Sequence, residues 1–222
     1  TLIFVYTSAI NFFITNAYTN TMLMKTLSLH SLITATALLG ITSLASAQKA
    51  PMKFGKIEDP VQLTMTRYEK DTAAEALVLG DYGESHVVLD EKEGWFVEYT
   101  RHFRAKIFKK SGYDWATQSI VLYHTPGATE KLLLLKGVVY NSENGKITES
   151  ELEKSMINEE IIDNKHTEHK FTLPNVREGS ILEYTYKVRS PYLSIPEWRF
   201  QYTIPALFSE YRVSYPEYFD YK

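Results

Sequence analysis

A strict alternation of apolar and polar side chains late in the chain constrains its fold more than any other feature. The apolar positions of one face are Leu182, Tyr184, Tyr186 and Val188, and the polar positions of the other are Glu183, Thr185, Lys187 and Arg189. A period of two is typical of a half-buried strand in an antiparallel sheet. Before this strand, Pro174 lacks a backbone donor and Gly179 can adopt a positive φ. Residues 171–190 therefore predict a strand, a turn and a second strand.

Further strand patterns recur along the chain, separated by turn residues. They cover residues 82–89, 95–108, 115–124, 132–140, 198–204 and 211–215. The Lys-Lys-Ser-Gly turn at 109–112 favours a hairpin between the second and third of these. Strands at intervals of roughly 8–12 residues are typical of β-sandwiches. We expect a mainly β chain, an antiparallel β-sandwich-like domain with one or two short helices, preceded by a signal peptide.

Two segments carry helical signals. Asp71 can cap a short helix that has Glu75 in its first turn. Between residues 148 and 170 the pattern leaves two alternatives open. Thr148 with Glu151 fits a capping box, and Leu152 with Met156 fits an i, i+4 pair, but the charges that follow suit an irregular edge strand equally well.

The first 47 residues indicate export. Lys25 is their only charged residue, an apolar run follows it, and Ala45-Ser46-Ala47 is a small-residue cleavage motif before Gln48. The alternative, an uncleaved membrane anchor, is weakened by the hydroxyl residues and by His30 within the run. We expect residues 1–23 to be an upstream or artefactual segment, 24–47 a signal peptide, 48–59 a lead-in linker and 60–222 the β-rich domain. The protein would be periplasmic or secreted.

Charge and cysteine content exclude several classes of function. The net charge of −3 gives no basis for nucleic-acid binding, and we expect membrane contact only through the signal peptide during export. The chain has no cysteine, which excludes a disulfide framework, a thiolate metal site and a thiol nucleophile. The domain must therefore be held together by burial of its core.

No pattern of residues singles out a catalytic or metal site. His166 and His169 near Asp163 have the spacing of metal ligands on a helix, but a site needs further ligands and this segment is as charged as a surface loop. Acidic residues are frequent without marking a carboxylate pair. We predict no catalytic, cofactor-binding or metal-binding residue and no cofactor. Aromatic rows suit either a stacking platform or, more commonly, a sheet core; they are Trp95, Tyr99 and Phe103, Trp198, Phe200 and Tyr202, and Tyr211 and Tyr215.

Several motifs in a fixed order resemble one family. They are ALVLGDYG at 76–83, RAKIF at 104–108 with GYD at 112–114, YNSENGKI at 140–147, LPNV at 173–176 with GS at 179–180, and IPEW at 195–198 leading to SEY at 209–211. Together they resemble the domain-of-unknown-function family that lies N-terminal to a transglutaminase-like core in exported bacterial proteins. The resemblance implies a β-rich first domain followed by a papain-like core with a Cys-His-Asp triad. Because the chain lacks cysteine, no catalytic residue carries over to it.

Three hypotheses of function follow. In the first, the chain is the non-catalytic N-terminal domain of an exported transglutaminase-like protein, cut short at Lys222. It would position the downstream core, or present a protein or glycan partner to it. In the second, it is a stand-alone extracytoplasmic module that binds a glycan or a peptide. In the third, the chain is itself a hydrolase, which would need a carboxylate pair that the pattern does not mark.

Overall fold

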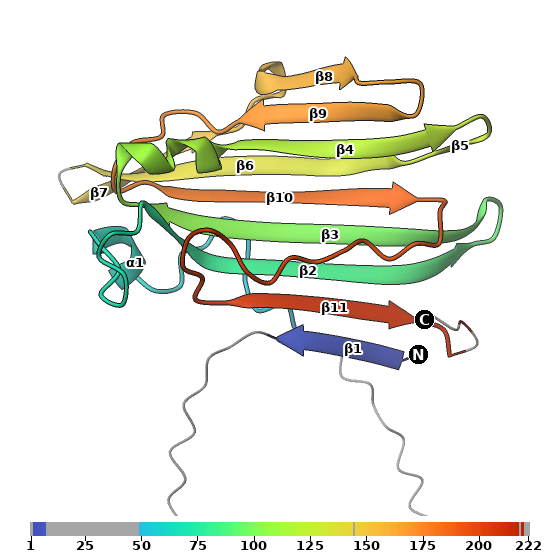
Figure 1. Ribbon diagram of the computed structural model, residues 1–222, viewed down its shortest axis with the longest axis horizontal. Helices are drawn as coiled ribbons and strands as arrows, with labels where there is room; N and C mark the ends of the chain where they lie inside the picture. The colour runs from blue at the N-terminus through green and yellow to red at the C-terminus, as the bar shows by residue number, and fades with distance from the viewer. Residues whose placement is uncertain (1, 8–48, 144, 218, 220–222) are drawn as a thin grey trace, which may run out of the picture. The chain divides into compact units, whose positions relative to one another are not determined.

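The computed structural model describes residues 2–7, 49–143, 145–217 and 219. The chain divides into a unit of residues 1–9 and 50–222 and a unit of residues 10–49, and only the first is described below. The predicted signal peptide, residues 24–47, lies outside the described residues. The described part is mainly β, as predicted (Figure 1).

Two sheets make up the described unit. The larger has the strand order β1 (Leu2–Thr7), β11 (Ser209–Tyr215), β2 (Ala76–Asp90), β3 (Gly94–Ile107), β10 (Ile181–Ser190), β6 (Lys131–Glu143) and β7 (Lys146–Glu151). The smaller has the order β5 (Ala128–Thr129), β4 (Thr117–Thr125), β9 (His166–Thr172) and β8 (Ile157–Ile161). All ladders are antiparallel except the one between β11 and β2. The helical segments are α1 (Val61–Thr64) and the 3₁₀ turns η1 (Lys110–Ala116) and η2 (Lys154–Met156).

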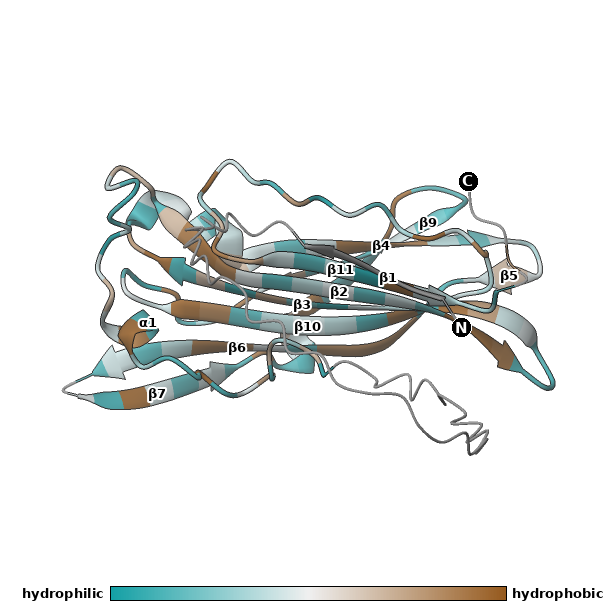
Figure 2. Ribbon diagram, turned by 90° about the horizontal axis from the view of Figure 1, so that it is seen from below, coloured by the Kyte–Doolittle hydropathy of each residue, from teal (hydrophilic) through white to brown (hydrophobic). Residues whose placement is uncertain are grey.

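Strand β10 lies within the larger sheet, between β3 and β6, and confirms the alternation in the sequence (Figure 2). Its apolar positions face the smaller sheet, where Leu182 and Tyr184 are buried. The turn before it is also confirmed, because Gly179 has φ of 87°. A half-buried strand would expose its polar face to solvent, and in this respect the prediction was wrong, since Glu183 on that face is completely buried.

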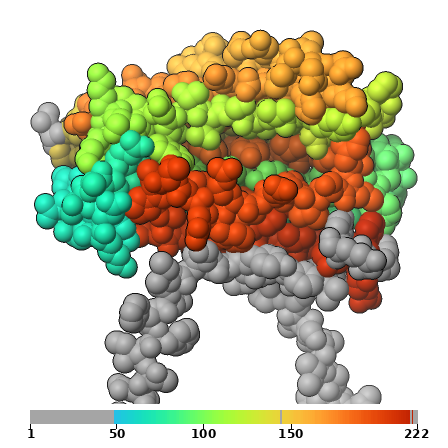
Figure 3. Space-filling model, in the orientation of Figure 1, coloured from blue at the N-terminus to red at the C-terminus, as the bar shows by residue number. Residues whose placement is uncertain are grey.

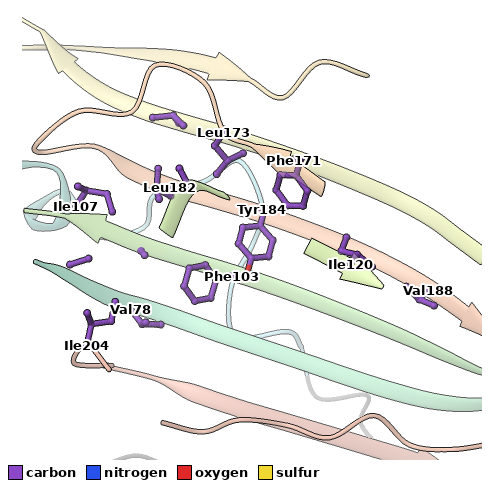
Figure 4. Close-up of a cluster of buried hydrophobic side chains, with 14 of the residues drawn as sticks. Val78, Phe103, Ile107, Ile120, Phe171, Leu173, Leu182, Tyr184, Val188 and Ile204 are labelled. Carbon is purple, nitrogen blue, oxygen red and sulfur yellow. The ribbon is translucent and has the colours of Figure 1, made fainter. Parts of the chain in front are cut away.

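The main core lies between the two sheets (Figure 4). Phe103 and Tyr184 stack with ring centroids 5.1 Å apart, and Phe171 from β9 meets Tyr184 edge-on at 5.7 Å. Ile120 from β4 belongs to the same cluster. Aromatic side chains that bridge two sheets bury large apolar areas, which is the main favourable contribution to the stability of a cysteine-free domain.

The predicted hairpin between residues 95–108 and 115–124 is wrong. Both edges of β3 are occupied, one by β2 and the other by β10, so β4 has no place beside it. The turn η1 carries the chain out of the larger sheet, and β4 pairs with β9 in the smaller one. Competition from strands that are distant in the sequence therefore overrides the local turn signal.

Two further elements differ from the prediction. No helix follows Asp71, whose carboxylate accepts a hydrogen bond from the Ala73 amide in a turn before β2 begins. The short helix is α1 instead, and the Asp59 carboxylate accepts a hydrogen bond from the amide of its first residue. Residues 198–204 do not form a strand. Prolines flank this segment, and aromatic side chains rather than a ladder hold it in place.

Residues 148–170, for which the sequence left both a helix and an edge strand open, consist mainly of strands. Strand β7 pairs with β6, and β8 pairs with β9, while the helical signal corresponds only to the single turn η2. At the other end of the chain, β1 pairs with β11. The prediction that residues 1–23 are an upstream or artefactual segment stays a prediction.

Candidate functional site

An irregular segment, residues 191–208, crosses the inner face of the larger sheet beside β4 (Figure 1). We call it the strap. At one end, the Tyr192 hydroxyl donates to the Ala128 carbonyl at 2.8 Å, and the Tyr192 ring lies 4.9 Å from that of Tyr123. Towards the other end, Tyr202 meets Trp115 edge-on at 5.8 Å. The strap is therefore fixed to the smaller sheet and to η1 at two separate points.

Between these points the strap packs on β2, β3 and β11. The Trp198 indole stacks on Tyr211 with centroids 5.0 Å apart, over a part of β2 where Gly83 provides the space. A Cβ at Gly83 would lie 2.3 Å from the indole. Arg101 is the one charged residue on the face of β3 that also carries Tyr99 and Phe103, and its partner explains its place there. Arg101 forms a bidentate ion pair with the buried Asp81, with both N–O distances 2.9 Å.

A groove lies between the strap and β4, over a floor made by β3 and β10 (Figure 3). Its volume is about 310 Å³. Tyr99 and Tyr186 lie in its floor with ring centroids 5.8 Å apart, and Ser194 and Pro196 line the strap side. Glu130 is the one carboxylate among the lining residues that the structure describes. Such a mixture of aromatic floor and polar rim suits binding of a ligand.

The opposite face of the larger sheet carries a buried polar cluster centred on Glu183. One carboxylate oxygen accepts from His102 Nε2 at 2.7 Å and from Arg104 at 2.5 Å, and the other accepts from the Tyr140 hydroxyl at 2.8 Å. The amide of Gly55 donates to the same group at 3.1 Å. Burial alone would raise the pKa of Glu183, but the bonds from His102 and Arg104 outweigh it and hold that pKa below its ordinary value.

This cluster fastens residues 53–63, which precede β2, to the larger sheet. The Arg104 guanidinium donates to the carbonyls of Lys53 and Lys56, at 3.1 and 2.8 Å. Lys106 donates to the carbonyls of Leu63 and Gly179, at 2.9 and 2.5 Å. All the polar groups of this cluster that could act as acids or bases are therefore engaged in holding the chain together. We interpret the cluster as structural.

The buried Lys106 makes stability depend on pH. Burial lowers the pKa of its ammonium group to about 8, from 10.5 in the unfolded chain. Between these values the unfolded chain holds a proton that the folded chain has lost, so the free energy of unfolding rises with pH. We expect Lys106→Met to abolish a rise of about 1–3 kcal/mol between pH 8 and 10.5. Urea denaturation of both proteins across this range measures the difference; identical pH profiles would contradict it.

The histidines singled out in the sequence do not come together. His166 and His169 lie on β9, and side chains three apart on a strand point to opposite faces. His166 Nδ1 lies 2.9 Å from the Asp163 carboxylate, while His169 Nδ1 lies 3.8 Å from Glu159. No group of three or more metal-ligating side chains occurs within the residues that the structure describes.

Sequence reasoning missed both the groove and the buried polar cluster. The irregular strap was interpreted as a strand because Trp198, Phe200 and Tyr202 alternate with polar residues. The cluster had one usable signal: every second residue of β3 from His102 to Lys106 is basic, and Arg104 pairs in register with the acidic Glu183 of β10. Helices long and apolar enough for a membrane span are absent from the part of the chain that is described.

Comparison with protein families assigns the chain. The model for a domain of unknown function with solved structure, DUF3857, matches residues 97–222. The chain belongs to this family. The match includes β10, both walls of the groove and most of its floor. A search of the curated proteins gave no match.

Solved structures resemble the DUF3857 chain at low sequence identity. A provisionally assigned protease from Parabacteroides distasonis matches with a TM-score of 0.50 and 17% identity, over 64% of this chain and 29% of that protein. An M1 zinc metallopeptidase from Deinococcus radiodurans matches with a TM-score of 0.25 and 13% identity, over 56% of this chain and 22% of that one. The first match shows a shared fold alone, and the second carries no argument. The chain spans less than a third of the length of either protein.

Proposed function

We propose that this chain is the non-catalytic N-terminal β-domain of an exported transglutaminase-like protein. It would position a downstream catalytic core, or present a partner or substrate to that core. The observation that carries the proposal is how the polar groups are used. The buried carboxylates Glu183 and Asp81 are tied to arginines that hold the fold, whereas the groove offers tyrosines, serine hydroxyls and one carboxylate for binding.

Two other facts support the proposal. The chain has no cysteine, so a transglutaminase-like nucleophile would have to come from another part of the protein. The fold match with the Parabacteroides protein covers 29% of that protein, so this fold occurs there as one part of a longer chain.

The test is to read the gene beyond the codon for Lys222 and to express the complete protein with and without residues 48–222. We expect a core with a Cys-His-Asp triad. Removing the domain should lower its activity on a protein substrate by on the order of tenfold, because the effective concentration of a held substrate is lost. Its activity on a small amide should change little. The proposal fails if no such core follows, or if the 222-residue chain alone catalyses the reaction.

A stand-alone extracytoplasmic module for glycans or peptides is the second candidate, and the groove beside β4 favours it. It differs from the first in needing no core. If a stop codon follows Lys222 and the chain still binds a ligand, the second candidate replaces the first.

Both candidates place the protein outside the cytoplasm, in the periplasm or the medium. The pattern of residues 24–47 supports this placement. Mass spectrometry of the protein from its own cells should find a mature N-terminus at Gln48; a protein recovered with these residues intact would count against cleavage.

A further inference from the structure

The edge of β4 that borders the groove is open. Strand β5 pairs with β4 only at His124 and Thr125, and β9 occupies the other edge of β4. The Ala116 carbonyl accepts a hydrogen bond from the Leu173 amide, and the His124 amide donates one to the Lys165 carbonyl. The even-numbered residues of β4 therefore direct their backbone amides and carbonyls toward β9. Backbone direction alternates along a strand. Odd-numbered residues therefore face the groove.

The backbone groups of Tyr123, an odd-numbered residue, confirm this direction, because both form hydrogen bonds on the groove side. Its amide donates to the Glu130 carboxylate at 2.8 Å, and its carbonyl accepts from the Glu130 amide at 3.0 Å. Val121 and Ser119 lie two and four residues earlier on the same edge, respectively, and both line the groove. Across the described residues, no backbone partner pairs with their amides and carbonyls on this side. The edge thus has its hydrogen-bonding groups free where the groove is open.

The remaining walls suit an extended chain laid along this edge. The strap opposite β4 forms no ladder, because Pro191 and Pro196 remove donors, and the Tyr192 hydroxyl anchors it to the Ala128 carbonyl. Below, Tyr99 and Tyr186 would receive every second side chain of such a segment. An extended peptide that adds to a sheet edge uses main-chain bonds for affinity and side-chain pockets for specificity.

The charges of the groove favour a basic side chain. Among the described residues that line it, Glu130 is the one carboxylate, and none is a lysine, arginine or histidine. The nearby Arg101 is neutralised by Asp81. Tyrosine faces attract cations in addition.

We propose that this groove binds an extended peptide segment that pairs with the β4 edge at Ser119 and Val121 and places a lysine or arginine side chain between the tyrosine floor and Glu130. The inference rests on the proposed role of the domain in positioning or presenting a partner, and it identifies that partner as a basic, unstructured polypeptide segment.

The test uses the 222-residue chain and a labelled probe, the capped peptide Thr-Val-Lys-Val-Thr. The matched control peptide has glutamate in place of the lysine. Fluorescence anisotropy should show saturable binding of the lysine peptide and at least about tenfold weaker binding of the glutamate peptide, since like charges would meet at Glu130. Glu130→Gln, which keeps an acceptor for the Tyr123 amide, should weaken binding of the lysine peptide by about two- to fivefold.

Backbone pairing is tested separately. Val121→Pro removes the amide that faces the groove and leaves the β4–β9 ladder intact, and Val121→Thr is the control that keeps the amide. We expect binding to fall at least about tenfold in the proline variant and to stay unchanged in the threonine variant. If the proline variant does not fold, a peptide N-methylated at alternate amides gives the same answer with the unchanged protein.

Several outcomes would overturn the inference. They are equal affinity for the two peptides, binding that survives both the proline variant and N-methylation, and absence of binding. Binding of a chitin oligosaccharide with no binding of peptide would identify a glycan site instead. The deletion of residues 48–222 from the complete protein is a separate experiment. If the core proves independent of the domain, the proposed function is contradicted and the groove proposal is not. If the peptide does not bind, only the groove proposal is contradicted.

Discussion

Replacing Glu183 by alanine is expected to destabilise the domain by about 3–5 kcal/mol. The carboxylate is completely buried and accepts hydrogen bonds from His102, Arg104 and Tyr140. Without it, the guanidinium of Arg104 remains buried with only the carbonyls of Lys53 and Lys56 as partners. Urea denaturation of the variant and of the unchanged chain, followed by circular dichroism, measures the loss.

The matched control is Glu69→Ala, which removes another glutamate paired with an arginine. This carboxylate is 75% exposed, and removing its pair with Arg67 should change stability far less than Glu183→Ala does, because solvent screens an exposed ion pair. A double variant, Glu183→Leu with Arg104→Met, should recover part of the stability, because apolar residues of similar volume replace a buried ion pair at little cost. A Glu183 variant as stable as the Glu69 variant would show that the buried polar cluster does not hold the fold.

Phe103→Ala is expected to cost about 3–5 kcal/mol as well, for a different reason. The ring is 1% exposed and stacks on Tyr184 and on Trp115, with centroids 5.1 and 6.1 Å away. It also meets Tyr202 of the strap edge-on at 6.2 Å. The substitution thus leaves a cavity where the larger sheet, η1 and the strap meet. Calorimetry gives the stability, and limited proteolysis should cut the strap faster.

Leu89→Ala serves as the control for Phe103, because Leu89 is 57% exposed at the end of β2 and should change stability by less than about 0.5 kcal/mol. If the two variants were equally stable, the core would not lie between the sheets at this ring. If Phe103→Ala were unstable but its strap resisted proteolysis, the contact with Tyr202 would not fix the strap.

The sequence predicted those parts of the fold that depend on neighbours along the chain. Alternation in β10 and the positive φ of Gly179 needed no distant contact, and both were confirmed. The hairpin after β3 was wrong because strands distant in the sequence occupy both of its edges. Residues 198–204 have a strand pattern, but Trp198 stacks on Tyr211 and no ladder forms. Pairing between distant segments cannot be read from local periodicity.

The candidate site was beyond the sequence for the same reason. A groove needs two walls, and here they are β4 and the strap, which are separated in sequence by residues 126–190. Arg101 alternates with apolar residues on β3, and its partner Asp81 lies on another strand, 20 residues earlier. Of the two tyrosines in the groove floor, Tyr99 stood in an aromatic row of the sequence and Tyr186 in the alternating strand, but neither pattern indicated a groove.

Amide hydrogen exchange of the 222-residue chain, resolved by residue with NMR, tests most directly whether this domain offers an open strand edge for binding. We predict that the amides of Ser119 and Val121 exchange rapidly, that those of Gln118, Ile120 and Leu122 are protected by β9, and that the lysine peptide slows the exchange of the first two. Protection of Ser119 and Val121 in the free protein would mean that the edge is already paired, and would contradict a binding role for this groove.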